Sequence, residues 1–346
     1  MLNICKMNKG KAIQQLFFES IKRRLPDHIS VVHEIADILE LSYDSAYRRL
    51  RGDKELSFEE IKVLCNRYGI SIDSLFGNNN ADILFQPFKL KAEETGFEEW
   101  LRLRIAEVSR VKVARNRELV MVARDLPIFY YFDFPELAAF KIFFWKKMLL
   151  HYPDHHEKKF NPNDIPVKLI ELGNNLLSAY NTIESVEIWC HETFLRMMQQ
   201  IEFFRISGYF EHKQDAVVLF EKFEELIRHM QDQTELGVKF HPGQSLMNDG
   251  EENFKVYINE VLLIDNTVFV QRDGVNRIMM THNSLDVLYT TNPVFCRQVE
   301  QALRIIMKTG NHISGTSGLE CNRFFTSIYE KLEEFKKESV LHRFLI

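Results

Sequence analysis

The sequence has no closely spaced cysteines and therefore no cysteine motif. Its five cysteines are spread over 346 residues without a CxxC spacing: Cys5, Cys65, Cys190, Cys296 and Cys321. An odd, scattered set is typical of free thiols in a reducing compartment and argues against a disulfide framework.

No segment predicts export or membrane insertion. Charged residues occur throughout the first 25 positions, which excludes the apolar core of a signal peptide there. The most apolar stretch, LPIFYYFDFPELAAFKIFFW (126–145), is interrupted by Asp133, Glu136 and Lys141, so it is too polar to span a bilayer. We therefore expect a cytoplasmic protein with no membrane partner.

Signatures of catalysis are also missing. The chain contains no GxxxxGK[ST], no GxGxxG after a strand and no GxSxG, so we expect no enzyme and no cofactor. HYPDHH (151–156) offers four metal ligands, His151, Asp154, His155 and His156, but no HExxH. We favour the interpretation that residues 151–156 form a solvated loop without a metal. Cys190 in CHE (190–192) is expected inside a helix, and the loop 309–318 is expected to be a plain capping loop, with an anion site as the alternative.

A strong excess of basic residues is absent as well. The net charge is −5, and residues 1–77 hold 12 Lys and Arg against 11 Asp and Glu. Any nucleic-acid-binding surface would therefore have to be local. The length and the globular composition, 45% hydrophobic and 27% charged, predict two domains or one small and one large domain.

The first 77 residues read as five short helices. Apolar residues at helical spacing predict helices in 12–25, 30–41, 42–52 and 57–69, with a one-turn element at 71–76. Gly52 is placed to end the third helix, and Ser57 with Glu60 forms a capping box at the start of the fourth. Residues 78–95 read as a linker.

Residues 96–346 predict a large second domain of mainly helical character. Helices are expected at 97–117, 136–150, 166–180, 183–206, 213–235, 292–309 and 317–337, the last opened by a capping box of Ser317 with Glu320. Short β-rich runs between 254 and 282, separated by Asp-Asn and Asp-Gly turns, predict a small antiparallel sheet. The expected fold is mainly α with this sheet near the C-terminus (α+β): 96–238 helical and 239–346 α+β. The aromatic block at 129–145 is expected to be core, with an interface or a pocket lining as alternatives.

The third predicted helix segregates its side chains around the helical wheel. One side holds Ala46, Leu50, Tyr43 and Tyr47, which are expected to dock. The opposite side holds Asp44, Ser45, Arg48 and Arg51, with Arg49 at the border. Small residues at 36 and 46 would let two helices cross closely, as a helix-turn-helix requires.

The run EIADILELSYDSAYRRLRGDKELSFEEIKVLCNRYGISIDSLF (34–76) resembles the Cro/CI-type (XRE-family, lambda repressor-like) helix-turn-helix domain. Ile35-Ala36 match its Leu-Ala pair, Ser42 matches the Ser that opens its recognition helix, and Arg51-Gly52 match its Arg-Gly. The closing 68–76 looks like the family's LGVSLDELF. Two positions depart: Glu40 replaces the usual turn Gly, and Arg49 replaces a buried apolar residue.

The resemblance implies a sequence-specific transcriptional regulator that binds a double-stranded DNA operator as a homodimer. Ser42 would cap the recognition helix. Tyr43, Asp44, Ser45 and Arg48 would face the groove, with Asp44 steering Arg48, while Arg49, Arg51 and Lys54 would meet phosphates. The large domain would sense an unidentified small-molecule or peptide effector, oligomerise, or both. The alternative is a signalling module whose helical region binds a peptide or protein partner.

Overall fold

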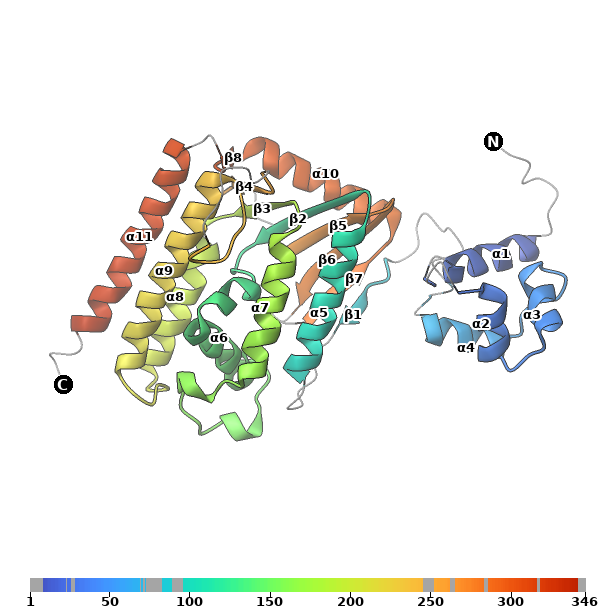
Figure 1. Ribbon diagram of the computed structural model, residues 1–346, viewed down its shortest axis with the longest axis horizontal. Coiled ribbons are helices and arrows are strands. Elements are labelled where there is room, and N and C mark those ends of the chain that lie inside the picture. The colour runs from blue at the N-terminus through green and yellow to red at the C-terminus, as the bar shows by residue number, and fades with distance from the viewer. Residues whose placement is uncertain are drawn as a thin grey trace. The chain divides into compact units, whose positions relative to one another are not determined.

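The computed structural model describes residues 9–22, 24–25, 29–68, 70, 72, 83–88, 96–244, 252–261, 265–282, 286–315 and 318–341. The chain divides into two compact units, Met1–Leu84 and Phe85–Ile346. We refer to them as the N-terminal unit and the C-terminal unit, and we describe each by itself (Figure 1).

The described residues of the N-terminal unit contain four α-helices and no strand. It contains α1 (Lys9–Lys22), α2 (Val31–Ile38), α3 (Tyr43–Leu50) and α4 (Phe58–Tyr68). These match the first four predicted helices, whereas the expected fifth element at 71–76 lies outside the described residues apart from Ile72. Their apolar faces meet in one core, which comprises Phe17, Phe18, Ile21, Ile35, Ala36, Ala46, Leu64 and Ile70. Each helix is too short to be stable alone, so this shared core holds them.

The C-terminal unit is built on a mixed sheet. Eight strands are described, in the order β1-β7-β6-β5-β2-β3-β4-β8. They are β1 (Gln86–Phe88), β2 (Arg117–Ala123), β3 (Ser185–Trp189), β4 (Phe254–Ile258), β5 (Thr267–Arg272), β6 (Val275–His282), β7 (Asp286–Thr290) and β8 (Asn311–His312). The pairs β2–β3 and β3–β4 are parallel, and the other pairs are antiparallel.

This sheet corrects the sequence-based expectation of a small antiparallel one. The α+β class holds, but β2 and β3 come from residues 96–238, which were expected to be helical. The segment 183–206, which was expected to be a single helix, instead contains the strand β3 near its start. Strand β2 lies between β3 and β5, and its residues Leu119–Ala123 are all buried. A strand that is covered on both faces has a continuous apolar sequence, without the alternation of a half-exposed strand.

Seven α-helices surround the sheet in the described residues. They are α5 (Gly96–Val113), α6 (Pro135–Met148), α7 (Val167–Asn181), α8 (His191–Ile206), α9 (Gln214–Leu236), α10 (Pro293–Thr309) and α11 (Gly318–Leu341). All seven lie where helices were predicted, apart from their ends. The Ser317 expected to cap α11 lies outside the described residues. No described helix combines the length and apolar character needed to cross a membrane.

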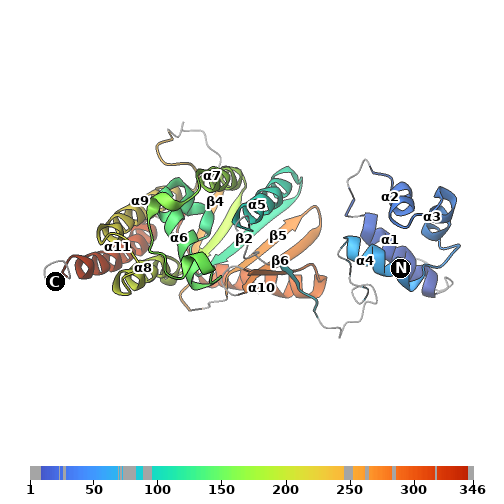
Figure 2. The same ribbon diagram turned by 90° about the horizontal axis from the view of Figure 1, so that it is seen from below.

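The two faces of the sheet have different covers. Figure 2 shows α5 and α7 on one side of the strands and α10 on the other. Strand alternation divides the side chains accordingly: Val120 and Val122 of β2 pack with Leu303 of α10, whereas Leu119 and Met121 join the main core beneath α5. Helices α6, α8, α9 and α11 extend this main core beyond the sheet (Figure 1). Most of the aromatic block at 129–145 is buried within it, as expected.

A buried polar cluster crosses the main core of the C-terminal unit. Glu187 of β3 is fully buried and accepts hydrogen bonds from the hydroxyls of Tyr130 and Tyr180 and, at 2.7 Å, from Trp189 Nε1. Lys239 Nζ donates to Ser185 Oγ at 2.7 Å. Burial raises the pKa of the Glu187 carboxyl and lowers that of the Lys239 amine to about 7, because both charged forms lose hydration.

Replacing Glu187 by Ala should destabilise the C-terminal unit strongly. Three buried donors would lose their acceptor and Lys239 would lose its nearby negative charge, so we expect a loss of roughly 3–5 kcal/mol in the free energy of unfolding. Urea unfolding followed by tryptophan fluorescence measures it, since all three tryptophans lie in this unit. The control is Glu184→Ala, a 63% exposed carboxylate paired with Lys255. Equal effects of the two changes would contradict the prediction.

Candidate nucleic-acid interface

The connection between α2 and α3 turns sharply at Glu40. Its φ of 52° is in the left-handed region, where Gly is normally favoured. The N–H of Leu41 donates to Ala36 O at 2.8 Å and the N–H of Glu40 donates to Asp37 O at 3.4 Å. This pair of bonds is a Schellman motif, which satisfies the last carbonyls of α2. The chain therefore adopts the tight turn although it lacks the usual Gly.

Helix α3 is fixed at both ends by its own sequence. Ser42 Oγ accepts from the N–H of Ser45 at 3.3 Å, so Ser42 is the N-cap, as predicted. At the other end Gly52 has a φ of 71°, and its N–H donates to Arg49 O at 2.9 Å. Asp53 N–H donates to Arg48 O at 2.8 Å, which completes a second Schellman motif. The left-handed residues Glu40 and Gly52 thus end α2 and α3, and Ser42 sets where α3 begins.

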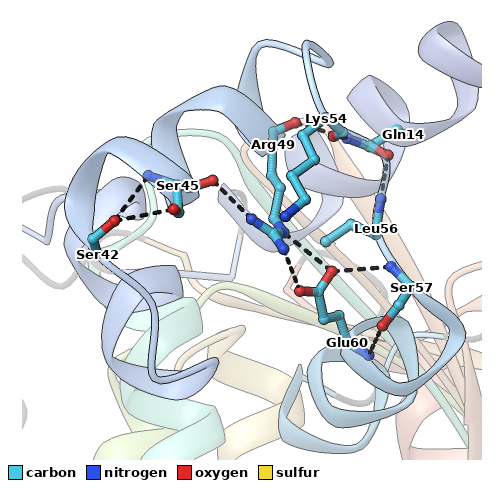
Figure 3. A network of polar contacts seen from close by, with 8 residues as sticks. All are labelled: Gln14, Ser42, Ser45, Arg49, Lys54, Leu56, Ser57 and Glu60. Carbon is cyan, nitrogen blue, oxygen red and sulfur yellow. Dashed lines mark hydrogen bonds and ion pairs between the residues drawn. The ribbon is translucent and has the colours of Figure 1, made fainter.

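Arg49 is buried, contrary to the expectation that it meets a phosphate. Its side chain is 5% exposed, and Nε and Nη2 donate to the two carboxylate oxygens of Glu60 at 3.1 and 2.6 Å (Figure 3). Nη1 donates to Ser45 O at 3.1 Å. These donors point into the protein, so Arg49 anchors α3 to α4 instead of facing a partner.

Glu60 connects this anchor to the start of α4. One of its carboxylate oxygens also accepts from the N–H of Ser57 at 2.9 Å, while Ser57 Oγ accepts from the N–H of Glu60 at 3.2 Å. The predicted capping box is therefore present. Partial burial by itself raises the pKa of Glu60, but the hydrogen bonds from Arg49 and Ser57 outweigh it and leave the pKa below its ordinary value.

Gln14 of α1 holds the loop that follows α3. Its side-chain amide donates to Arg49 O at 2.8 Å and to Lys54 O at 2.9 Å, and its carbonyl oxygen accepts from the N–H of Leu56 at 3.0 Å. Figure 3 shows these bonds on the side of Arg49 that faces α1. The loop carrying Lys54 is thus tied to the unit by its backbone, and the Lys54 residue is exposed.

The solvent face of α3 carries two tyrosines: Tyr43, which was expected to reach the groove from the apolar side of the wheel, and Tyr47, which was expected to dock. Tyr43 is 53% exposed and Tyr47 is 44% exposed. Their rings stack with centroids 6.4 Å apart and planes within 5°, the Arg51 guanidinium lies 5.8 Å from the Tyr47 centroid, and His33 of α2 meets Tyr43 edge-on at 5.1 Å. Because Ala46 and Arg49 point inward, the helix is rotated from the orientation that the wheel predicted.

The remaining predicted residues lie on or beside this face. Asp44 and Arg48 are exposed, and Ser45 is half-buried. The expected ion pair between Asp44 and Arg48 does not form in the described structure; Arg51 instead approaches Asp53 at 3.4 Å. Arg51 and Lys54 are exposed as well. Sequence reasoning missed Tyr47 and His33 as surface residues, since aromatic side chains at helical spacing usually signal core.

The other candidates show no comparable site. The described residues contain no group of three or more His, Cys, Asp or Glu side chains that could hold a metal, so the cluster at 151–156 is not one. Cys190 is buried at the N-cap of α8.

Ser178, His241 and Asp133 form a hydrogen-bonded series, with Ser178 Oγ to His241 Nε2 at 2.9 Å and His241 Nδ1 to Asp133 Oδ1 at 2.9 Å. The order is that of a nucleophile, base and acid. Ser178 lies inside α7, however, where backbone N–H groups are committed to intrahelical bonds and cannot form an oxyanion hole.

Comparison with known proteins finds one similarity to a domain family. The BetR domain model matches residues 22–93. The match includes α2, α3 and α4 and therefore the whole face just described, and it ends before α5. No curated protein and no solved structure matches the chain.

Arg49→Ala should destabilise the N-terminal unit, whereas Arg51→Ala should not. Removing Arg49 leaves the half-buried Glu60 without its cation, so we expect a loss of about 3 kcal/mol; Arg51 is 62% exposed, and its loss should change stability by less than about 0.5 kcal/mol. Hydrogen–deuterium exchange of residues 43–68 in the full chain measures local opening. Similar exchange in both variants would exclude the anchoring role.

Glu40→Gly should stabilise the same unit. Gly removes the steric penalty of the left-handed conformation, and its greater freedom in the unfolded chain offsets part of the gain, so we expect a net increase of about 0.5–1 kcal/mol. The matched control is Asp37→Gly inside α2, which should destabilise by a similar amount. The observable is again exchange protection of α2 and α3; a Glu40→Gly variant with faster exchange would refute the argument.

Proposed function

We propose that the N-terminal unit is a Cro/CI-like helix-turn-helix that binds double-stranded DNA, with α3 as its recognition helix. The supporting observation is the exposed face of α3, where Tyr43, Tyr47, Asp44 and Arg48 project from a helix fixed at both ends and from behind. A recognition helix needs such a rigid, outward face whose hydrogen-bonding groups reach base edges. The BetR match covers the same helices.

The residues on this face suit different parts of a DNA site. The Arg48 guanidinium can donate two bonds to guanine, and Asp44 and Ser45 can bond base edges from the first turn. The stacked rings of Tyr43 and Tyr47 can contact thymine methyl groups and sugars, which gives a reason for their exposure. Arg51 and Lys54, beyond the end of α3, are placed for phosphates.

We further propose that the protein is a cytoplasmic transcriptional regulator that acts as a homodimer. One recognition helix of eight residues covers a short half-site, so two copies on adjacent half-sites would add their contacts. The C-terminal unit would then sense an effector, oligomerise, or both. The alternative, a peptide-binding helical array, has less support because β2 and β3 interrupt the region it would use.

Arg48→Ala should weaken binding to the operator and relax its sequence preference. The operator is first selected from genomic fragments with the purified full chain. If Arg48 donates to a base, its loss should cost about 1–3 kcal/mol of binding free energy at one position of the site. Lys54→Ala should instead weaken binding to all sequences and reduce the salt dependence by about one counterion.

The control for both variants is Arg228→Ala, which removes a 62% exposed arginine from α9 of the C-terminal unit. Fluorescence anisotropy with the selected operator and with shuffled DNA measures each affinity. Unchanged operator binding by Arg48→Ala would exclude Arg48 as a base-reading residue. Failure of the wild-type chain to enrich any DNA would exclude the proposed function itself.

A further inference from the structure

The C-terminal unit contains a cavity of about 290 Å³ between α5 and the sheet. Its floor comes from β2, β5 and β6, and its roof from α5; the side walls include Phe129, Trp145 and Tyr180. Figure 2 shows α5 lying over these strands, on the side opposite α10. All lining residues belong to one unit, so the cavity is complete within it.

Strand and helix periodicity make this cavity mainly apolar. Alternate residues of neighbouring strands form the floor, with Met121, Val268 and Met279 in register across β2, β5 and β6. The roof uses residues of α5 at helical spacing: Trp100, Arg104, Val108 and Val111. The volume is about twice the roughly 150 Å³ that holds a benzene molecule, which suits a ligand of about ten non-hydrogen atoms.

Aromatic rings form much of the wall. Trp145 and Tyr180 are buried, and Phe129 contacts Tyr180 with ring centroids 4.4 Å apart. Met121 and Met279 bring thioethers from the floor, and such side chains adapt their shape and make favourable contacts with aromatic rings. A lining of rings and thioethers therefore favours an aromatic ligand, which can pack against both.

Trp100 supplies a donor for which the protein provides no acceptor. Its Nε1 is buried, and no acceptor among the described residues lies within hydrogen-bond distance of it. Trp100 comes from the second turn of α5 and lines the cavity. Buried indole N–H groups normally have a partner, because an unsatisfied donor has lost its bond to water without a replacement. A ligand oxygen in the cavity would supply that partner.

Charged side chains of both signs line the cavity. One carboxylate oxygen of Glu107 lies 2.8 Å from Arg104 Nη1, and the other lies 3.6 Å from Arg277 Nη1. Asp125 pairs with Lys141 at 2.7 Å. An anionic ligand would share the cavity with two carboxylates, and a cationic ligand would share it with the two arginines. Since a charged ligand would also lose its hydration, the lining favours a neutral one.

We propose that this cavity binds a neutral aromatic molecule that carries a carbonyl oxygen, with its ring against the floor and walls and its oxygen accepting from Trp100 Nε1. The apolar lining supplies affinity, and the indole N–H fixes the orientation. As an effector site the cavity rests on the proposed regulatory function, but binding itself does not require DNA.

Four compounds built on one indane skeleton test the ligand class on the full chain. The ketone 1-indanone carries a carbonyl oxygen, indane has no polar group, indane-1-carboxylate is an anion and 1-aminoindane is a cation. Isothermal titration calorimetry should show saturable binding of 1-indanone with a Kd below about 1 mM. The two charged compounds should bind at least about tenfold more weakly. No saturable binding of 1-indanone or of the larger 1-tetralone, or tighter binding of either charged compound, would overturn the proposal.

The variant Trp100→Phe tests the hydrogen bond. A carbonyl that leaves water without gaining a new donor loses binding free energy, so 1-indanone needs Trp100 whereas indane does not. In the wild-type chain 1-indanone should bind at least as tightly as indane. The variant should weaken 1-indanone binding by about fivefold and change indane binding by less than about twofold. An equal change for both compounds would exclude Trp100 as the donor and refute the proposed binding mode.

The wild-type chain offers a second readout, because it contains only three tryptophans. Nuclear magnetic resonance of the isotope-labelled indole N–H groups should show one signal that moves downfield with 1-indanone and less with indane. Trp100→Phe identifies that signal by removing it. If this variant does not fold, as judged by circular dichroism, the shift and the ligand series still decide the result. Unmoved indole signals at saturating 1-indanone would contradict the hydrogen bond.

Two further variants locate the site. Val268→Phe should fill the floor and abolish binding of both 1-indanone and indane. Phe203→Leu, at a 43% exposed residue of α8 outside the lining, should change neither affinity. Unchanged 1-indanone binding by Val268→Phe would place the ligand elsewhere and refute the site.

The binding assay contains no DNA, so its outcome is separate from that of the operator assay. Binding of 1-indanone without any DNA enrichment would support the ligand site and refute the regulator. DNA enrichment without binding of 1-indanone would refute the ligand site and leave the regulator supported.

Discussion

The candidate interface depends on the buried ion pair between Arg49 and Glu60. An arginine that is almost wholly buried cannot turn outward without leaving a carboxylate uncompensated, so this pair fixes the rotation of α3 about its axis. Once Arg49 points inward, Tyr43 and Tyr47 must point outward, since they lie on the other side of the helix. Glu60 also belongs to the capping box of α4, so the same carboxylate sets the start of one helix and the orientation of another.

Much of the N-terminal unit could be predicted because its signals are local. Ser42, Gly52 and the Ser57–Glu60 capping box act within a few residues, and each has its predicted structural role. The rotation of α3 could not be predicted in the same way. A wheel sorts residues by polarity, and it placed Arg49 at the border because it could not include Glu60, eleven residues away. Arg49 is buried because it pairs with Glu60, whereas the aromatic residues Tyr43 and Tyr47 are exposed.

The sheet was underestimated for a related reason. The antiparallel strands β5 and β6 are joined by a short Asp273-Gly274 turn, which the sequence displays directly. The parallel strands β2 and β3 are separated by α6 and α7; β2 contains a short apolar run, β3 is only five residues long, and no turn signal joins them. Such runs do not reveal whether they are strands or buried helix segments, because alternation disappears when both faces are covered. The cavity between α5 and the sheet was equally hidden, since its floor combines β2 with β5 and β6, which lie far from β2 in the sequence.

Two arginines of α3 show how the surroundings decide the role of one residue type. Arg49 has a carboxylate of its own and is buried with it, which makes it structural. Arg48 is exposed on the face of α3, so water solvates it. A buried arginine needs a completed charge balance within the protein, whereas an exposed arginine keeps its hydration and needs no such partner, and this difference separates the anchor of α3 from its outward face.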